Sequence, residues 1–255
     1  MANSKPTIFF LPGGFHSPWV FDSVRSILSD RGIATDAAAF PSIGTTDPRV
    51  GMLDDAKHLR SLLTKAIDEE GKEVVLVAHS YAGVASANAV EGLGVHQRKA
   101  RGERGGVLMI LYLAASVIPA GTSFAELLDP NNLPWDVSED GFVKPNNAIH
   151  RYYADVEPAL ANRAVEALKS MPMQVLLDKS TYEPWKQGFE VGYVFTEDDN
   201  SLPLGLQKAI WAQFPEGSFA ASLASGHSPF LNVPRDLADA IEKGIDNVVG
   251  TKPSA

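Results

Sequence analysis

The sequence of 255 residues contains no cysteine. This absence excludes disulfide bonds, thiolate metal sites and a cysteine nucleophile. The chain also lacks an apolar run near the roughly 20 residues that a membrane span needs. The apolar stretch within the first segment, "MANSKPTIFFLPGG", is too short for a secretory signal peptide. We therefore expect a soluble, cytoplasmic protein that does not act in a membrane.

Basic residues are in the minority as well. Lys and Arg number 22 against 31 Asp and Glu, which gives a formal net charge of −9. An acidic protein repels phosphate backbones and anionic lipid. The one positive cluster lies in "HQRKARGERGG" (96–106), which we interpret as a solvated loop rather than a binding patch. Nucleic acid and membrane surfaces are therefore not expected as partners.

Short apolar runs alternate with segments of helical periodicity. Strands are predicted over 7–11, 33–40, 73–79, 107–116, 191–196 and 218–224, and helices over 19–32, 52–71 and 234–249. This alternation predicts an α/β fold, with a mostly parallel sheet of about six strands and helices on both of its faces.

Residues 119–188 interrupt the alternation. They are rich in proline and aromatic residues, and they contain one predicted helix (155–171) with Asp155 as its N-cap. We predict that this segment is a small cap inserted over the carboxyl ends of the strands. The core then consists of residues 1–118 and 189–255.

Ser80 stands between an apolar strand and a run of small residues, in "EVVLVAHSYAGVASANAV". A serine on such a sharp strand-to-helix turn is lifted out of the sheet, and the residues two before and two after it must be small. Here they are Ala78 and Ala82, where the usual motif has glycine. The pattern predicts a nucleophile, and a serine that merely caps a helix is the alternative.

A serine hydroxyl needs a base, usually a histidine that is oriented by a carboxylate. His227 follows the last predicted strand of the core, whereas His150 falls in the cap and is expected to be structural or to line a pocket. Glu197, Asp198 and Asp199 follow the preceding strand, and any of them is a candidate acid. Serine, acid and histidine then stand in the chain order of a hydrolase triad.

The loop after the first strand, "LPGGFHSPW", is expected to supply part of an oxyanion hole. Gly13 and Gly14 let backbone N–H groups face a ligand without an intervening Cβ. We predict that the N–H groups of Gly14 and Tyr81 bind the oxyanion. His16 is expected to brace this loop by hydrogen bonding.

Apolar side chains of the cap and of the loops around it are expected to line the substrate pocket, although some belong to the core. They are Phe15, Trp19, Tyr112, Phe124, Leu133, Trp135, Tyr152, Trp185 and Phe230. Their abundance suggests an apolar or aromatic substrate of modest size. The residues imply no metal and no organic cofactor.

Four segments resemble the α/β-hydrolase superfamily: "LPGGFHSPWVFDSV", "VVLVAHSYAGV", "GYVFTEDDNSLPLGLQ" and "GHSPFLNVP". Within it, the chain is similar to small enzymes that include plant methylesterases, hydroxynitrile lyases, bacterial esterases and fungal hydrolases. The resemblance covers essentially the whole chain and implies the α/β-hydrolase fold. It places the family's acid on Asp199, with Asp198 as the fallback.

The chain departs from the lyase members of this superfamily. They have a Thr in the first loop and a Lys after the catalytic histidine, where this chain has Gly13 and Ser228. Without a cation beside His227, nothing stabilises a departing cyanide. The expected activity is therefore hydrolysis of a small-molecule ester or lactone through Ser80, His227 and Asp199 and an acyl-enzyme.

Two alternatives stay open, and so does a homodimer. The first is a non-hydrolytic or C–C-bond-cleaving biosynthetic enzyme, for example in fungal secondary metabolism, since one fold hosts many reactions. The second is a ligand receptor with vestigial turnover.

Overall fold

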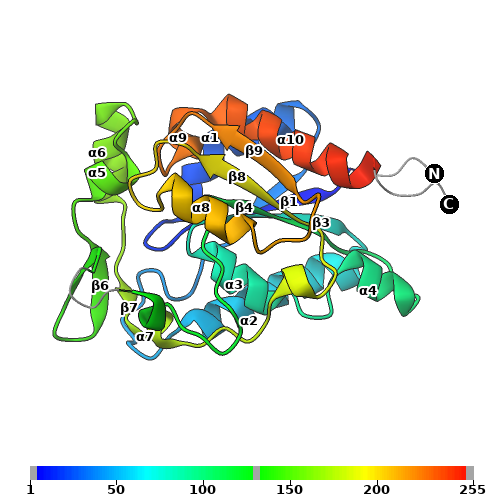
Figure 1. Ribbon diagram of the computed structural model, residues 1–255, viewed down its shortest axis with the longest axis horizontal. Helices are drawn as coiled ribbons and strands as arrows, with labels where there is room; N and C mark the ends of the chain where they lie inside the picture. The colour runs from blue at the N-terminus through cyan, green and yellow to red at the C-terminus, as the bar shows by residue number, and fades with distance from the viewer. Residues whose placement is uncertain (1–4, 129–132, 251–255) are drawn as a thin grey trace.

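A computed structural model describes residues 5–128 and 133–250, and its centre is a six-stranded sheet (Figure 1). The strand order is β2-β1-β3-β4-β8-β9, and every pairing is parallel. The strands are β1 (Thr7–Leu11), β2 (Thr35–Ala37), β3 (Glu73–His79), β4 (Gly106–Leu113), β8 (Val191–Thr196) and β9 (Phe219–Leu223). The predicted α/β fold and its mostly parallel sheet are confirmed.

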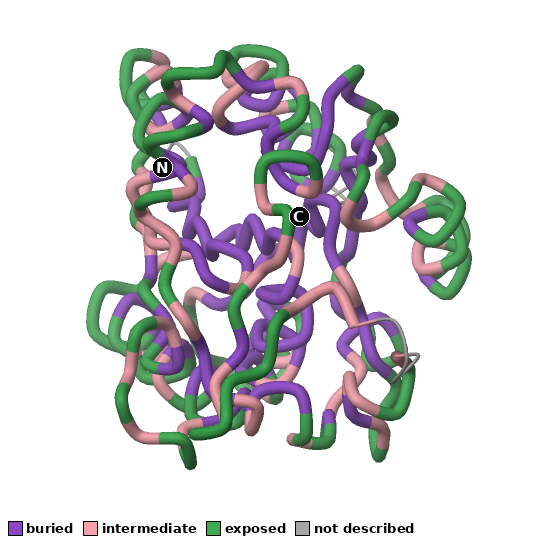
Figure 2. Tube along the Cα trace, turned by 90° about the vertical axis from the view of Figure 1, so that its left-hand side faces the viewer, coloured by how far each residue is buried: buried purple, intermediate pink, exposed green. Residues whose placement is uncertain are grey.

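Helices cover both faces of this sheet. Side chains alternate along a strand, so Ile8 and Phe10 pack on the side of α1 (Asp22–Asp30) and α10 (Pro234–Gly250). Phe9 and Leu11 pack on the side of α2 (Met52–Thr64) and α3 (Ala82–Ala89). Burial on both faces explains why these strands are continuous apolar runs. Figure 2 shows the buried parts of the chain gathered in the interior and the exposed parts at the periphery.

The remaining core helices are shorter. They are η1 (Pro18–Phe21), η2 (Lys65–Glu69), α4 (Val95–Ala100), α8 (Leu204–Trp211) and α9 (Pro229–Asn232). The interpretation of 96–106 as a solvated loop was wrong, because its first half is the helix α4. Arg98 of α4 is buried and forms ion pairs of 2.6 Å with Asp68 and 3.2 Å with Glu103. Within the described ranges, no helix is both long and apolar enough to cross a bilayer.

Residues 119–188, the predicted cap segment, hold a second, antiparallel sheet of order β5-β6-β7 beyond the carboxyl ends of the main strands (Figure 1). Its strands are β5 (Trp135–Val137), β6 (Phe142–Pro145) and β7 (Met171–Pro172). The helices of this segment are η3 (Ala125–Leu127), α5 (Ala148–Tyr152), α6 (Pro158–Glu166), α7 (Gln174–Leu177) and η4 (Pro184–Lys186).

The helix predicted over 155–171 is shorter at both ends, and its predicted N-cap is wrong. It is α6, which begins at Pro158, a residue whose fixed φ suits the first helical position. Glu157 is the N-cap, and its carboxylate accepts a 3.0 Å hydrogen bond from the backbone N–H of Leu160. Asp155 instead reaches the loop that carries His227.

Gly83 lets α3 pack closely on the segment after β4. A Cβ atom at this position would overlap the carbonyl oxygen of Ser116 and lie 3.1 Å from the Cβ of Ala115. The backbone oxygen cannot move aside as a flexible side chain would. The first turn of α3, which follows Ser80, is therefore held against the end of β4.

We expect the substitution Gly83→Ala to lower the free energy of unfolding by about 2 kcal/mol, because the added methyl group forces α3 away from the sheet. Urea denaturation of both proteins measures the difference. Gly205→Ala in α8 is the matched control, since a Cβ there meets nothing within 4 Å. Equal stability of the Gly83→Ala and Gly205→Ala proteins would contradict this packing.

Candidate active site

Ser80 lies on the sharp turn between β3 and α3. Its φ is +53°, in the left-handed region that residues other than glycine rarely adopt. Hydrogen bonds on both sides hold it there: its N–H donates to the carbonyl of Leu113, and its carbonyl accepts from the N–H of Ser116, both at 3.2 Å. Ala78 and Ala82 are fully buried beside it. Strain of this kind concentrates at functional sites. Here the strained turn places the hydroxyl of Ser80 at the start of α3.

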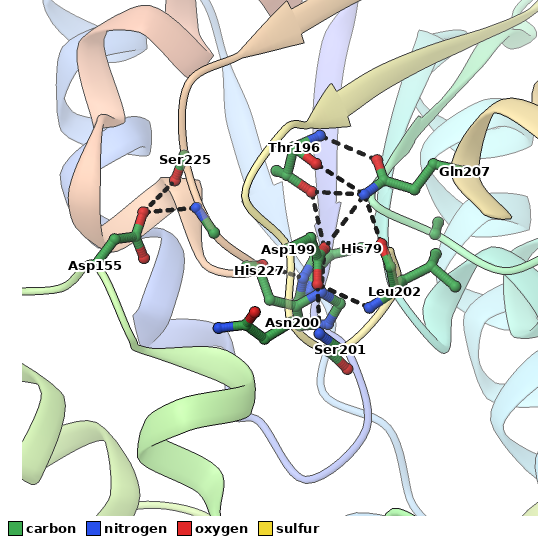
Figure 3. A network of polar contacts seen from close by, with 12 residues as sticks. His79, Asp155, Thr196, Asp199, Asn200, Ser201, Leu202, Gln207, Ser225 and His227 are labelled. Carbon is green, nitrogen blue, oxygen red and sulfur yellow. Dashed lines mark hydrogen bonds and ion pairs between the residues drawn. The ribbon is translucent and has the colours of Figure 1, made fainter. Parts of the chain in front are cut away.

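His227 and Asp199 form a short hydrogen bond in the interior. Nδ1 of His227 lies 2.7 Å from Oδ2 of Asp199, and both side chains are buried (Figure 3). An ionised carboxylate only accepts, so Nδ1 carries the proton and Nε2 keeps its lone pair for a hydroxyl donor. Glu197 and Asp198 are exposed and do not contact the ring. Of the three candidate acids, the structure therefore brings Asp199 to the histidine.

Asp199 is held by further donors from the end of β8 and the loop after it. Thr196 Oγ1 donates to Oδ2 at 2.8 Å, and the N–H groups of Ser201 and Leu202 donate to Oδ1 at 2.7 and 2.8 Å (Figure 3). Burial alone would raise the pKa of Asp199, but the charge of His227 and these hydrogen bonds outweigh it and lower the pKa. The carboxylate therefore stays ionised and able to hold an imidazolium.

His79, which sequence reasoning missed, links the serine turn to the histidine loop. Its Nε2 lies 2.9 Å from the carbonyl oxygen of His227 and donates to it. Burial, together with the nearby charges of His227 and His16, lowers the pKa of His79 well below its ordinary value. The only signal in the sequence is its place directly before Ser80.

His16 braces the loop after β1, as predicted. Its Nδ1 donates to the carbonyl of Gly14 at 2.7 Å, and its Nε2 accepts from the hydroxyl of Tyr153 at 2.8 Å. Burial lowers the pKa of His16 to about 4, against the opposing effect of the bond to Gly14. His16 is therefore neutral near pH 7. Across the described ranges, no three His, Asp or Glu side chains are placed to hold a metal ion.

The predicted oxyanion donors flank Ser80. Gly14 and Tyr81 line the same cavity as the serine, and no acceptor from the described chain bonds to the N–H of either residue. The loop and the serine turn are closely packed, because a Cβ at Gly13 would lie only 2.9 Å from the Cβ of Ser80. N–H groups that have no protein acceptor and line the cavity of a serine are what a predicted oxyanion hole requires.

A cavity of about 220 Å³ opens over Ser80 and His227, and Phe15, Phe124, Trp135 and Tyr152 of the predicted pocket line it. The other lining residues come from the cap segment, from the loop after Asp199 and from the core. They are Gly14, His16, Tyr81, Ser116, Leu128, Pro134, Met171, Leu176, Ser201, Leu202 and Leu206. The walls are mainly apolar, with a few polar groups beside the serine.

Five residues predicted for the pocket do not line this cavity. Trp19 lies under the guanidinium of Arg163, and Phe230 is fully buried against Phe21 and His79. Tyr112 and Trp185 are buried in the core, where both pack against Phe214. Leu133 is half-buried beside Pro134, which does line the cavity. Aromatic content alone does not show which face of a segment meets the substrate.

Tyr81 is fixed from behind by a buried carboxyl group. Its hydroxyl donates to Asp55 at 2.6 Å, and Ser42 donates its hydroxyl at 2.5 Å and its N–H at 2.8 Å to the same group. Burial raises the pKa of Asp55 to about 6, against these three hydrogen bonds, which favour the ionised form. This contact joins α2 to the residue that is predicted to supply an oxyanion donor.

The substitution Asp55→Asn should remove a pH dependence of stability. The folded protein keeps the proton of Asp55 up to about pH 6, whereas the unfolded chain releases it near 3.8. The neutral carboxyl group therefore stabilises the fold fully below pH 3.8. This contribution, roughly 3 kcal/mol in total, is lost as the pH rises from there through 6. Urea unfolding at pH 4 and pH 8 should show this loss in the wild type relative to Asp55→Asn. If the free energies of unfolding of the two proteins differed by the same amount at pH 4 and pH 8, the raised pKa of Asp55 would be contradicted.

The chain is similar to known proteins over most of its length. The chain matches the alpha/beta hydrolase family over residues 8–240. It is 28% identical over 253 residues to the alpha/beta hydrolase nvfD of Aspergillus novofumigatus (strain IBT 16806), covering 96% of this chain and 97% of that protein. It is 22% identical over 262 residues to norfluorocurarine synthase 2 of Strychnos sp, covering 93% and 94%.

A solved structure shares the fold. The methylesterase MES16 from Arabidopsis superposes with a TM-score of 0.75 at 21% identity, over 94% of this chain and 99% of that chain. The resemblance predicted from four short segments is confirmed by a family match that spans most of the sequence. This protein belongs to the alpha/beta hydrolase family.

Proposed function

We propose that this α/β hydrolase is a serine esterase or lactonase that cleaves a small apolar or aromatic substrate. The observation that supports it most is the buried His227–Asp199 pair at the cavity that also exposes Ser80. The pair presents a basic nitrogen to a hydroxyl that is otherwise a weak nucleophile.

In this proposal the reaction begins when Oγ of Ser80 attacks the substrate carbonyl while Nε2 of His227 takes the hydroxyl proton. Asp199 keeps the imidazole in the right tautomer and stabilises the imidazolium. The N–H groups of Gly14 and Tyr81 bind the oxyanion, and losing one such donor costs on the order of 3 kcal/mol. His227 then protonates the leaving alkoxide, and water releases the acid from the acyl-enzyme.

The walls of the cavity support a substrate that is mostly apolar. Phe15, Trp135 and Leu202 line the cavity together with the serine, and its volume of about 220 Å³ is smaller than that of most drug-sized pockets. The Arabidopsis relative is named a methylesterase, which agrees with an ester that has a small leaving group. The cytoplasmic location and the homodimer stay predictions.

A non-hydrolytic reaction on the same residues is the second candidate. It is favoured by one observation, the relative of similar length that is named norfluorocurarine synthase 2. In such a reaction the triad moves protons or cleaves a C–C bond without consuming water, and the cavity is then a site for biosynthetic chemistry.

Replacing members of the triad tests the proposed mechanism. We expect Ser80→Ala and Asp199→Asn to lower kcat/KM for nitrophenyl esters of short acids by about 10⁴-fold or more. Asp198→Asn is the matched control, since this neighbouring carboxylate is exposed, and it should retain nearly the wild-type rate. Full activity of Ser80→Ala in a purified sample would refute the mechanism.

Isotope incorporation separates the two candidate functions. Hydrolysis in heavy-oxygen water must place a solvent oxygen in the acid product, because water cleaves the acyl-enzyme. Mass spectrometry of the product therefore should show labelled acid from every turnover. An unlabelled product that still requires Ser80 would favour the non-hydrolytic reaction.

A further inference from the structure

One carboxylate of the cap segment is hydrogen-bonded to the loop that carries His227. Asp155 lies between α5 and α6, and its Oδ2 accepts from the hydroxyl of Ser225 at 3.0 Å and from the N–H of Gly226 at 2.6 Å. The side-chain amide of Asn232 donates to the same oxygen at 2.6 Å. Figure 3 shows the carboxylate of Asp155 directed at Ser225 of this loop.

The loop is shaped to receive this carboxylate. A Cβ atom at Gly226 would lie 2.7 Å from Oδ1 of Asp155, so a larger residue there would require the carboxylate to shift. Ser225 is buried and directs its hydroxyl at the same group. Among the residues of known placement, Asp155 forms no ion pair, and its buried Oδ1 has no hydrogen-bond partner. The three donors on Oδ2 are therefore what hold the carboxylate in place.

The other anchors of this loop come from the core. The carbonyl of Ser225 accepts from the N–H of Asp198 at 3.1 Å, and the carbonyl of His227 accepts from Nε2 of His79 at 2.9 Å. Asp155 is the anchor from the cap segment, and it binds the N–H of the residue directly before the histidine. Tyr152 of the same segment places its ring 5.5 Å from the imidazole.

We infer that Asp155 is a positioning residue for the catalytic base. By fixing Ser225 and Gly226, it holds the imidazole of His227 where Nδ1 meets Asp199 and the ring lines the same cavity as Ser80. This role rests on the hydrolytic function proposed above. A displacement of about 1 Å in a reacting group costs on the order of 10²-fold in rate. If only the core held the loop, the imidazole of His227 would be less well positioned and would act as a poorer base.

The substitution Asp155→Ala should lower kcat by roughly 10²-fold and change KM by less than about threefold, because it moves the base and spares the cavity walls. Hydrogen–deuterium exchange of the backbone over residues 224–232 should rise by about tenfold or more. Asp155→Asn should restore most of both properties, since its amide oxygen can accept the same three bonds.

Glu157→Ala is the matched control, because it removes a cap carboxylate two residues away whose bonds, among the described residues, are to the first turn of α6. It should leave kcat and the exchange of 224–232 unchanged. Thermal unfolding of each variant identifies a protein that has simply failed to fold, and in that event Asn232→Ala, which removes one donor, takes the place of Asp155→Ala. For Asn232→Ala the expected loss of kcat is smaller, about three- to tenfold.

The outcomes distinguish this inference from the proposed function. Unchanged exchange over 224–232 in Asp155→Ala overturns the inference, and so does raised exchange with an undiminished kcat. A kcat that falls in Asp155→Ala but not in Asp155→Asn supports the inference. A wild-type protein that neither hydrolyses esters nor labels with a fluorophosphonate removes the proposed function, and exchange alone then decides whether Asp155 holds the loop.

Discussion

The short hydrogen bond between His227 and Asp199 is the interaction on which the site depends. It fixes the tautomer of a buried imidazole and leaves its second nitrogen free for a proton. The surrounding donors keep the acid ionised in a place where burial alone would favour its neutral form. The neighbouring imidazoles His16 and His79 have lowered pKa values, so they hold the loops without competing for the same proton.

Close packing of the backbone is the second constraint. The loop after β1 approaches the serine turn so closely that a side chain is excluded at Gly13, and the start of α3 approaches the segment after β4 so closely that one is excluded at Gly83. The strained φ of Ser80 persists because hydrogen bonds to Leu113 and Ser116 fix the backbone around it. Alanine replaces the usual glycine at positions 78 and 82, and both methyl groups are accommodated in the core.

Much of the fold and part of the site could be predicted from sequence, for identifiable reasons. The strands predicted over 73–79 and 191–196 agree with β3 and β8 residue for residue, because burial on both faces leaves an uninterrupted apolar run. Ser80, Asp199 and His227 each follow a strand of a parallel sheet, so their chain order indicated that they would meet at one edge.

Contacts between distant segments could not be predicted. Asp155 and Gly226 are 71 positions apart in the chain. In the sequence, Asp155 stands directly before a helical segment, where an aspartate is usually a helix cap. The contact of Asp55 with Tyr81 is equally invisible in a helical pattern. Periodicity also does not show the direction of an aromatic ring in an irregular segment, which is why Trp185 and Phe230 were assigned to the pocket and lie in the core.

The loop after β8 serves two purposes at once. Ser201 and Leu202 line the cavity, yet their N–H groups also hold Asp199. A change of substrate preference that reshapes this wall therefore risks disturbing the acid. Evolution of new specificity in this enzyme is less constrained in the cap segment, where Phe124 and Trp135 line the cavity and, within the described ranges, form no hydrogen bond to Ser80, Asp199 or His227. Diversification of its substrates should therefore be concentrated in the cap.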